Sequence, residues 1–123
     1  MLNTIQLQEF VWERLKLSKI PINEIITPNV FFTDKVCMAG IFLYFHKKKY
    51  CIKFITQYKS EEAVYYFDSP DDLLFSLLKY QISQKAIHET GGYKYKSLAL
   101  EIFKSIDDEY YNRAVIDFNN GSW

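Results

Sequence analysis

The side chains of this sequence that could support chemistry are two cysteines, two histidines and several short runs of carboxylates. Cys37 and Cys51 lie among apolar residues, where a free thiol behaves as a small hydrophobic group. Three lysines follow His46 and oppose metal binding there, and His88 lies near the expected end of a helix, where a protonated imidazole interacts favourably with the helix dipole. These residues therefore have structural explanations, and a cysteine–histidine pair that meets only in the fold is the catalytic alternative.

Sequence motifs that mark enzyme active sites are missing from the chain. It contains no glycine-rich phosphate loop, nucleophile elbow, zincin helix or Cys-x-x-Cys pair. Two carboxylate runs, residues 68–72 and 107–109, have the composition of metal ligands. Both coincide with expected helix starts, where acidic side chains stabilise the positive end of the helix dipole. We therefore expect no enzymatic activity, no metal site and no cofactor.

Charged residues are segregated along the chain, although fifteen basic and fifteen acidic residues balance to a net charge of zero. Six lysines and no acid lie between Lys35 and Lys59, and five acids and no base lie between Glu61 and Asp72. A neutral chain has no general attraction for nucleic acid or anionic lipid, so we expect neither as a partner. Lysines at a hairpin tip discourage pairing between sheets, and single-stranded nucleic-acid binding by this basic hairpin is the alternative.

The sequence also predicts where the protein resides. The N-terminal segment carries acidic and basic residues from Glu9 to Lys16, a composition unlike that of a signal or transit peptide. No apolar run approaches the ~20 residues that cross a bilayer. We expect a cytoplasmic protein without a membrane partner.

Hydrophobic periodicity and capping signals predict one domain over residues 1–123. Ser69 and Pro70 mark the clearest boundary, since a capping residue followed by proline starts a helix. The expected elements are a helix over Ile5–Lys19; strands over Val30–Thr33, Gly40–His46, Tyr50–Tyr58 and Ala63–Phe67; and helices over Pro70–Glu89, Lys96–Ser105 and Asp107–Phe118. This order predicts an α+β fold in which an N-terminal helix precedes an antiparallel meander of three or four strands, and two or three C-terminal helices pack on the sheet.

Both faces of the strand Gly40–His46 are apolar or aromatic. The helices are expected to cover one face. The other face then presents Phe42 and Tyr44, with Lys53 on the next strand. Either the first helix crosses that face, or it is a binding surface.

Two segments of the C-terminal half resemble a known family. The helix start Asp71-Asp72-Leu73-Leu74-Phe75-Ser76-Leu77-Leu78, after the aromatic strand Val64-Tyr65-Tyr66-Phe67, resembles the corresponding region of bacterial immunity proteins that neutralise polymorphic or contact-dependent growth-inhibition toxins. The segment from Phe103 to Arg113 is similar to the stretch that leads into the last helix of that family. The likeness covers roughly Ile22 to Phe118.

This resemblance implies a cytoplasmic immunity protein, monomeric or weakly dimeric alone, that occludes a cognate toxin domain, expected to be a nuclease, in a stoichiometric complex. Acidic side chains on a rigid scaffold suit a basic partner. The partner-binding residues it points to are Glu61, Glu62, Asp71, Asp72, Asp107, Asp108, Glu109 and Tyr110. The alternative is a small non-enzymatic adaptor or oligomer-forming module that binds through Phe42, Tyr44 and Lys53.

Overall fold

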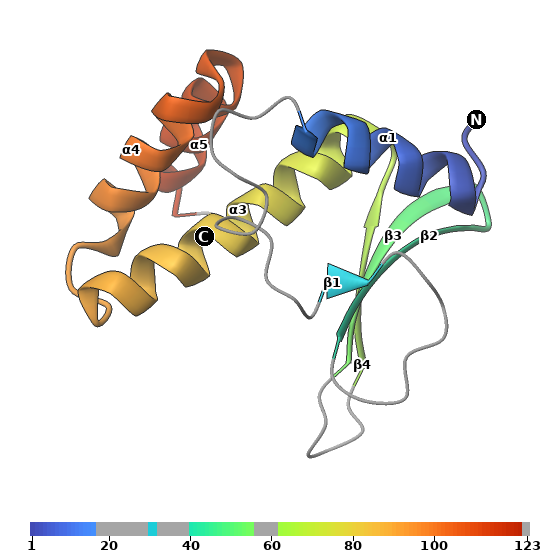
Figure 1. Cartoon of the computed structure of the whole chain (residues 1–123), viewed down its shortest axis with the longest axis horizontal. Helices are drawn as coiled ribbons and strands as arrows, with labels where there is room; N and C mark the ends of the chain where they lie inside the picture. The colour runs from blue at the N-terminus through green and yellow to red at the C-terminus, as the bar shows by residue number, and fades with distance from the viewer. Residues whose placement is uncertain (17–29, 32–39, 56–61, 122–123) are drawn as a thin grey trace.

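The computed structural model describes residues 1–16, 30–31, 40–55 and 62–121 (Figure 1). The elements in chain order are α1 (Thr4–Lys16), β1 (Val30–Phe31), β2 (Gly40–His46), β3 (Lys49–Ile55), β4 (Glu62–Phe67), α3 (Pro70–Thr90), α4 (Tyr95–Ile106) and α5 (Asp108–Asn119). The expected α+β fold is confirmed: the described residues form an N-terminal helix, a central sheet and three C-terminal helices. Cys37 and Glu61 lie outside the described residues.

The sheet has the strand order β1-β2-β3-β4. β2 pairs antiparallel with β3, and β3 pairs antiparallel with β4, which gives a three-stranded meander. The short β1 joins β2 in the parallel direction, with Val30 opposite Ile41. Strand propensity predicts that a segment is extended but does not encode its direction, so this parallel pairing could not be read from the sequence.

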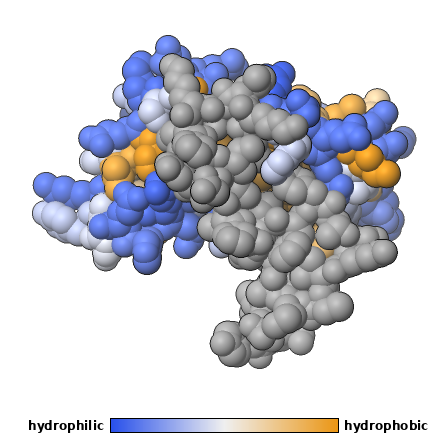
Figure 2. Space-filling model, viewed as in Figure 1, coloured by the Kyte–Doolittle hydropathy of each residue, from blue (hydrophilic) through white to orange (hydrophobic). Residues whose placement is uncertain are grey.

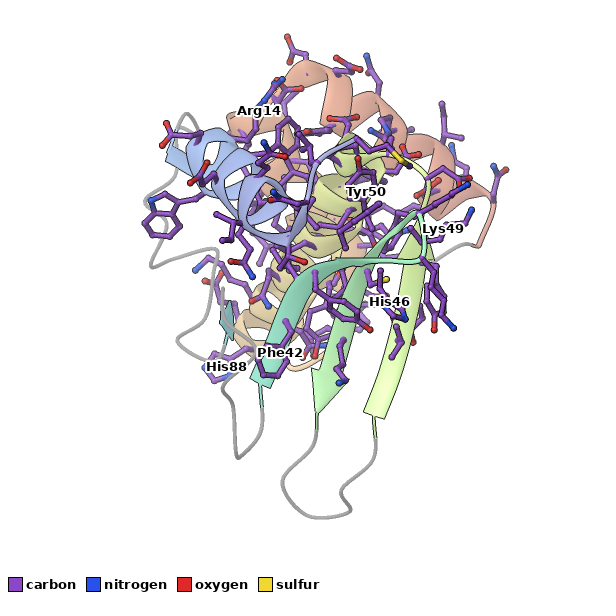
Figure 3. All side chains as sticks on the ribbon, turned by 90° about the vertical axis from the view of Figure 1, so that its right-hand side faces the viewer. Arg14, Phe42, His46, Lys49, Tyr50 and His88 are labelled. Carbon is purple, nitrogen blue, oxygen red and sulfur yellow. The ribbon has the colours of Figure 1, made fainter. Side chains whose placement is uncertain are left out.

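The two faces of the sheet have different surroundings. Side chains alternate between faces along each strand, so Leu43 and its partner Ile52 share one face. Both are buried in the core with Leu7 and Val11 of α1 and with the apolar face of α3. Figure 3 looks onto the opposite face, with α3 behind the strands. We call this opposite face the open sheet face; its residues include Phe42, Tyr44, His46, Lys49, Cys51, Lys53, Val64 and Tyr66. Because α1 packs on the core side, it does not cross the open sheet face.

α1 also covers the outer edge of β2. Asn3 and Gln6 form a reciprocal cap at the start of α1, with each side chain accepting a hydrogen bond from the other residue's backbone N–H. In the first turn of α1, Thr4 Oγ1 accepts a hydrogen bond from the Phe45 N–H at 3.0 Å; one turn later, Gln8 Nε2 donates to the Leu43 carbonyl at 2.9 Å. Side chains of α1 thus satisfy backbone groups that β1 is too short to pair.

The helices after the sheet begin and end within one residue of the positions that the sequence predicts. Ser69 accepts a hydrogen bond from the Asp72 N–H, Pro70 occupies the first helical position, and Gly91 ends α3 in the left-handed conformation. α3 contacts β3 and β4, whereas α4 packs on α3 and α5 packs on α4. None of the described helices combines the length and apolarity needed to span a membrane.

The hairpin between β2 and β3 turns on Lys47 and Lys48, both with positive φ angles, of 50° and 65°. A two-residue turn of this kind favours Asn-Gly, because side chains with a Cβ are strained in the left-handed region. We therefore expect the double substitution Lys47→Asn and Lys48→Gly to raise the free energy of unfolding by about 1 kcal/mol. Urea denaturation measures this change. The matched variant, Lys47→Gln with Lys48→Gln, removes the same charges without relieving strain, and an equal gain in that variant would contradict the explanation.

Candidate functional site

The starts of α3 and α5, 36 positions apart by the numbering of Asp71 and Asp107, meet at one end of the molecule. The Tyr110 hydroxyl donates a hydrogen bond to Asp71 Oδ1 at 2.8 Å. Arg113 donates from Nη1 to Asp71 Oδ2 at 2.8 Å and from Nη2 to Asp72 Oδ1 at 3.0 Å. We call this region the acidic junction; it comprises Asp71, Asp72, Asp107, Asp108, Glu109, Tyr110 and Arg113.

Local helix signals place these side chains. Asp107 is the N-cap of α5 and accepts a hydrogen bond from the Tyr110 N–H at 3.0 Å. Tyr110 and Arg113 are three residues apart, so they share one face of α5. That face is turned toward the first turn of α3, which begins with Pro70 and presents Asp71 and Asp72. Two ordinary helix starts thereby become one surface.

An aromatic cluster lies beneath the acidic junction. Phe75 is buried, and its ring centroid lies 5.9 Å from those of both Phe103 and Tyr110. The Arg113 guanidinium carbon lies 4.2 Å from the centroid of the Phe75 ring. Arg113 therefore stacks on an aromatic ring while its two terminal nitrogens bind carboxylates, an arrangement that the planar guanidinium permits and an ammonium does not.

The acidic junction keeps an excess of negative charge. Within the described part of the chain, two cationic side chains form ion pairs with its five carboxylates: Arg113, which binds Asp71 and Asp72, and Lys104, which pairs with Asp108 at 3.1 Å. The side chains of Asp71, Asp72 and Asp108 are 46%, 53% and 79% exposed, and Glu109 is also exposed. In the space-filling view, hydrophilic residues border the region of α3 and α4, with a hydrophobic patch among them (Figure 2). The surface is thus acidic, accessible and internally cross-linked.

The other predicted binding residues lie elsewhere. Glu62 begins β4 and is separated from Asp71 by the length of that strand, roughly 17 Å. Tyr44 and Lys53 are half-buried on the open sheet face, where the Lys53 ammonium lies 5.9 Å from the Tyr44 ring centroid. Phe42 is only 5% exposed. Of the three residues predicted for the alternative binding module, Tyr44 and Lys53 are therefore accessible to a partner, and Phe42 is not.

Two residues that organise the acidic junction, Arg113 and Phe75, are absent from the set predicted by sequence. Arg113 is the only basic residue of α5, and it follows Tyr110 by one helical turn. This spacing is the one sequence signal that could have identified Arg113. It becomes informative only when α5 is known to pack against the start of α3.

The Cys51 thiol lies on the open sheet face and is completely buried. Burial raises its pKa, with hydrogen bonds from the Tyr44 side chain and the His46 backbone acting in the opposite direction. Its Sγ lies 3.6 Å from the Lys49 carbonyl oxygen. A protonated, buried thiol is a poor nucleophile. Within the described ranges, no three His, Cys, Asp or Glu residues are arranged to hold a metal ion.

Replacing Arg113 by lysine tests the junction as a structural unit. Lysine keeps the charge but loses the bidentate contact and the stacking on Phe75, so we expect the free energy of unfolding to fall by about 1–2 kcal/mol. Chemical denaturation provides the measurement. Arg14→Lys is the control, because the exposed Arg14 lies farther from a ring, at 5.2 Å from Phe10. An Arg113→Lys variant as stable as Arg14→Lys would contradict this role.

The Tyr110 hydroxyl gives a pH-dependent test. Burial first, and then the hydrogen bond and negative charge of Asp71, raise the pKa of Tyr110 well above its usual value. A raised pKa in the folded state stabilises the protein below the unfolded pKa of about 10, and this stabilisation is lost as the pH rises above it. The loss is expected to stay below the ~1.4 kcal/mol per pH unit of one fully coupled proton, since the side chain is half-exposed. Tyr110→Phe should show a shallower decline in urea titrations between pH 9 and 11; identical declines would contradict the assignment.

Comparison of the chain with protein-family models, with curated proteins and with solved structures gave no match. The geometry and charge of the acidic junction, together with the resemblance noted in the sequence, are therefore the grounds for assigning a function.

Proposed function

We propose that this protein is an immunity protein that binds a cognate toxin domain with a basic surface, such as a nuclease, and neutralises it by occlusion. The observation that carries the proposal is the acidic junction, where two acidic turns that are distant in sequence form one exposed surface. An inhibitor of a toxin that acts inside the cell would reside in the cytoplasm.

The internal contacts of the junction favour tight recognition. Arg113 and Tyr110 hold Asp71 and Asp72 in place, so these carboxylates lose little conformational entropy when a partner binds. Asp108 and Glu109 are the more exposed groups at the rim. Exposed carboxylates of this kind accelerate encounter with a basic partner and select against acidic ones.

In the proposed complex, Tyr110 would support the interface more than contact the partner. Its hydroxyl is engaged by Asp71 and its ring packs near Phe75. It therefore supports the position of the carboxylates. Contact with the partner would come mainly from Asp72, Asp108 and Glu109, with Asp107 engaged as the cap of α5.

A second candidate function is a non-enzymatic adaptor that binds through the open sheet face. The observation in its favour is Tyr66, which is 63% exposed on that face and lies opposite the buried Cys51. Tyrosine is enriched among residues that dominate binding energy. The two candidates differ in the surface used, so surface variants separate them.

Co-expression with the product of the adjacent reading frame tests the immunity function. We expect the wild-type chain to rescue growth and to form a one-to-one complex. Asp108→Lys with Glu109→Lys should lower the association rate at least about tenfold and flatten its salt dependence, because both substitutions reverse the steering charge.

Glu89→Lys is the control for that variant. Glu89 lies near the end of α3, about 25 Å along the helix from Asp72, so its reversal changes the net charge away from the junction. If both variants change the association rate equally, the acidic junction does not form part of the interface. Absence of both rescue and complex would contradict the immunity function.

A further inference from the structure

The turn of the β2–β3 hairpin holds strained residues at positions that other residues occupy without strain. Lys47 and Lys48 both have positive φ angles, of 50° and 65°, in a turn whose geometry favours Asn-Gly. Asn-Gly would also keep the turn polar, so protection against pairing between sheets does not require strained lysines here. Residues held in sparsely populated backbone conformations concentrate at ligand-binding and switch regions. The two lysines are therefore candidates for a function of their own.

Both ammonium groups of the turn are accessible to a partner. The side chains of Lys47 and Lys48 are exposed, and within the described part of the chain neither forms an ion pair. The neighbouring Lys49 differs, because it pairs with Asp68 in the segment between β4 and α3. The turn thus presents two positive charges that no described side chain compensates.

The hairpin turn lies close to the acidic junction. Tyr50 of β3 lies opposite Phe67 of β4; Lys48 is two residues before Tyr50, and Asp71 is four residues after Phe67. Chain geometry therefore limits the Cα–Cα distance between Lys48 and Asp71 to roughly 27 Å. Lys49 marks this end of the sheet in Figure 3. An ordinary protein–protein interface covers about 800 Å² on each partner, a patch roughly 30 Å across, so one partner can reach both the turn and the junction.

The mixed charge at this end of the molecule indicates what binds the turn. A nucleic acid chain on the turn would meet the exposed carboxylates of Asp68 and of the acidic junction, which repel phosphates. A protein surface that carries both signs of charge matches both patches. A nuclease has this pattern, because cationic groups bind the phosphates of its substrate and carboxylates hold its metal ions.

We infer that Lys47 and Lys48 form a second contact of the proposed toxin complex and bind carboxylates of the toxin domain that adjoin its basic surface. The inference rests on the proposed function and adds to it the chemistry of the partner. His46 and Lys49 are the last paired residues of the hairpin, so the two lysines occupy its outermost positions. The tight turn limits their backbone freedom, which lowers the entropic cost of binding.

Calorimetric titration of the full chain with the product of the adjacent reading frame tests the inference. Lys47→Gln with Lys48→Gln, the neutral-turn variant, should weaken the complex by about tenfold or more, because two charge pairs are lost. Lys94→Gln with Lys96→Gln is the matched control. It removes two exposed lysines at the start of α4, and its affinity should stay near that of the wild type.

A further variant, Lys47→Asn with Lys48→Gly, separates binding from folding. It relieves the strain of the turn and is expected to be more stable than the wild type, yet it should bind as weakly as the neutral-turn variant. Damage to the fold cannot explain a loss of affinity in a more stable chain. An affinity equal to that of the wild type would overturn the inference.

Failure of the inference and failure of the proposed function give different results. A complex that Asp108→Lys with Glu109→Lys weakens, but that the neutral-turn variant leaves unchanged, would overturn the inference and leave the immunity function intact. Absence of any wild-type complex would contradict both.

Two other occupants of the turn are open to direct measurement. Concentration-dependent self-association of the wild-type chain that the neutral-turn variant loses would assign the turn to a second copy. A salt-sensitive gel shift of single-stranded nucleic acid that the same variant loses would assign it to nucleic acid. Either result would overturn the inference.

Discussion

The guanidinium of Arg113 is the group on which the arrangement of the C-terminal helices at the acidic junction depends. It stacks on Phe75 at 4.2 Å and binds Asp71 and Asp72, so one side chain joins α5 to the start of α3. An exposed ion pair alone contributes at most about 1 kcal/mol, but the bidentate contact, the aromatic bed and the Tyr110 hydrogen bond act together. Two turns further along α3, Lys79 pairs with Asp117 at 3.0 Å and continues the same attachment.

The internal ion pairs of the acidic junction also bear on the function proposed for it. Each carboxylate that Arg113 engages is partly neutralised, which weakens long-range attraction for a basic partner. The same contact removes the freedom that binding would otherwise cost. Asp108 and Glu109 remain accessible at the rim, so in the proposed complex steering and positioning would be divided between different residues of one surface.

Elements with local signals were predictable from the sequence, and relations between elements were not. Ser69 and Pro70 predict the start of α3, and Asp107 predicts the start of α5, because capping residues act on backbone groups within one helical turn. The sequence predicts the carboxylates of both acidic turns as candidate binding residues. The two acidic turns meet because α4, which lies between α3 and α5 in the sequence, packs against both helices. The role of Arg113 depends on this meeting of the two helix starts. The direction of β1 likewise follows from its pairing partner, which no local pattern encodes.

The central claim is that partner binding covers the acidic junction, which is formed by residues from α3 and α5. Hydrogen–deuterium exchange of the chain, free and mixed with the product of the adjacent reading frame as the proposed toxin, tests this claim most directly. We predict that protection on binding includes the first turns of α3 and α5, around Asp72 and Asp108. Protection confined to the open sheet face, with both helix starts exchanging as in the free chain, would contradict it.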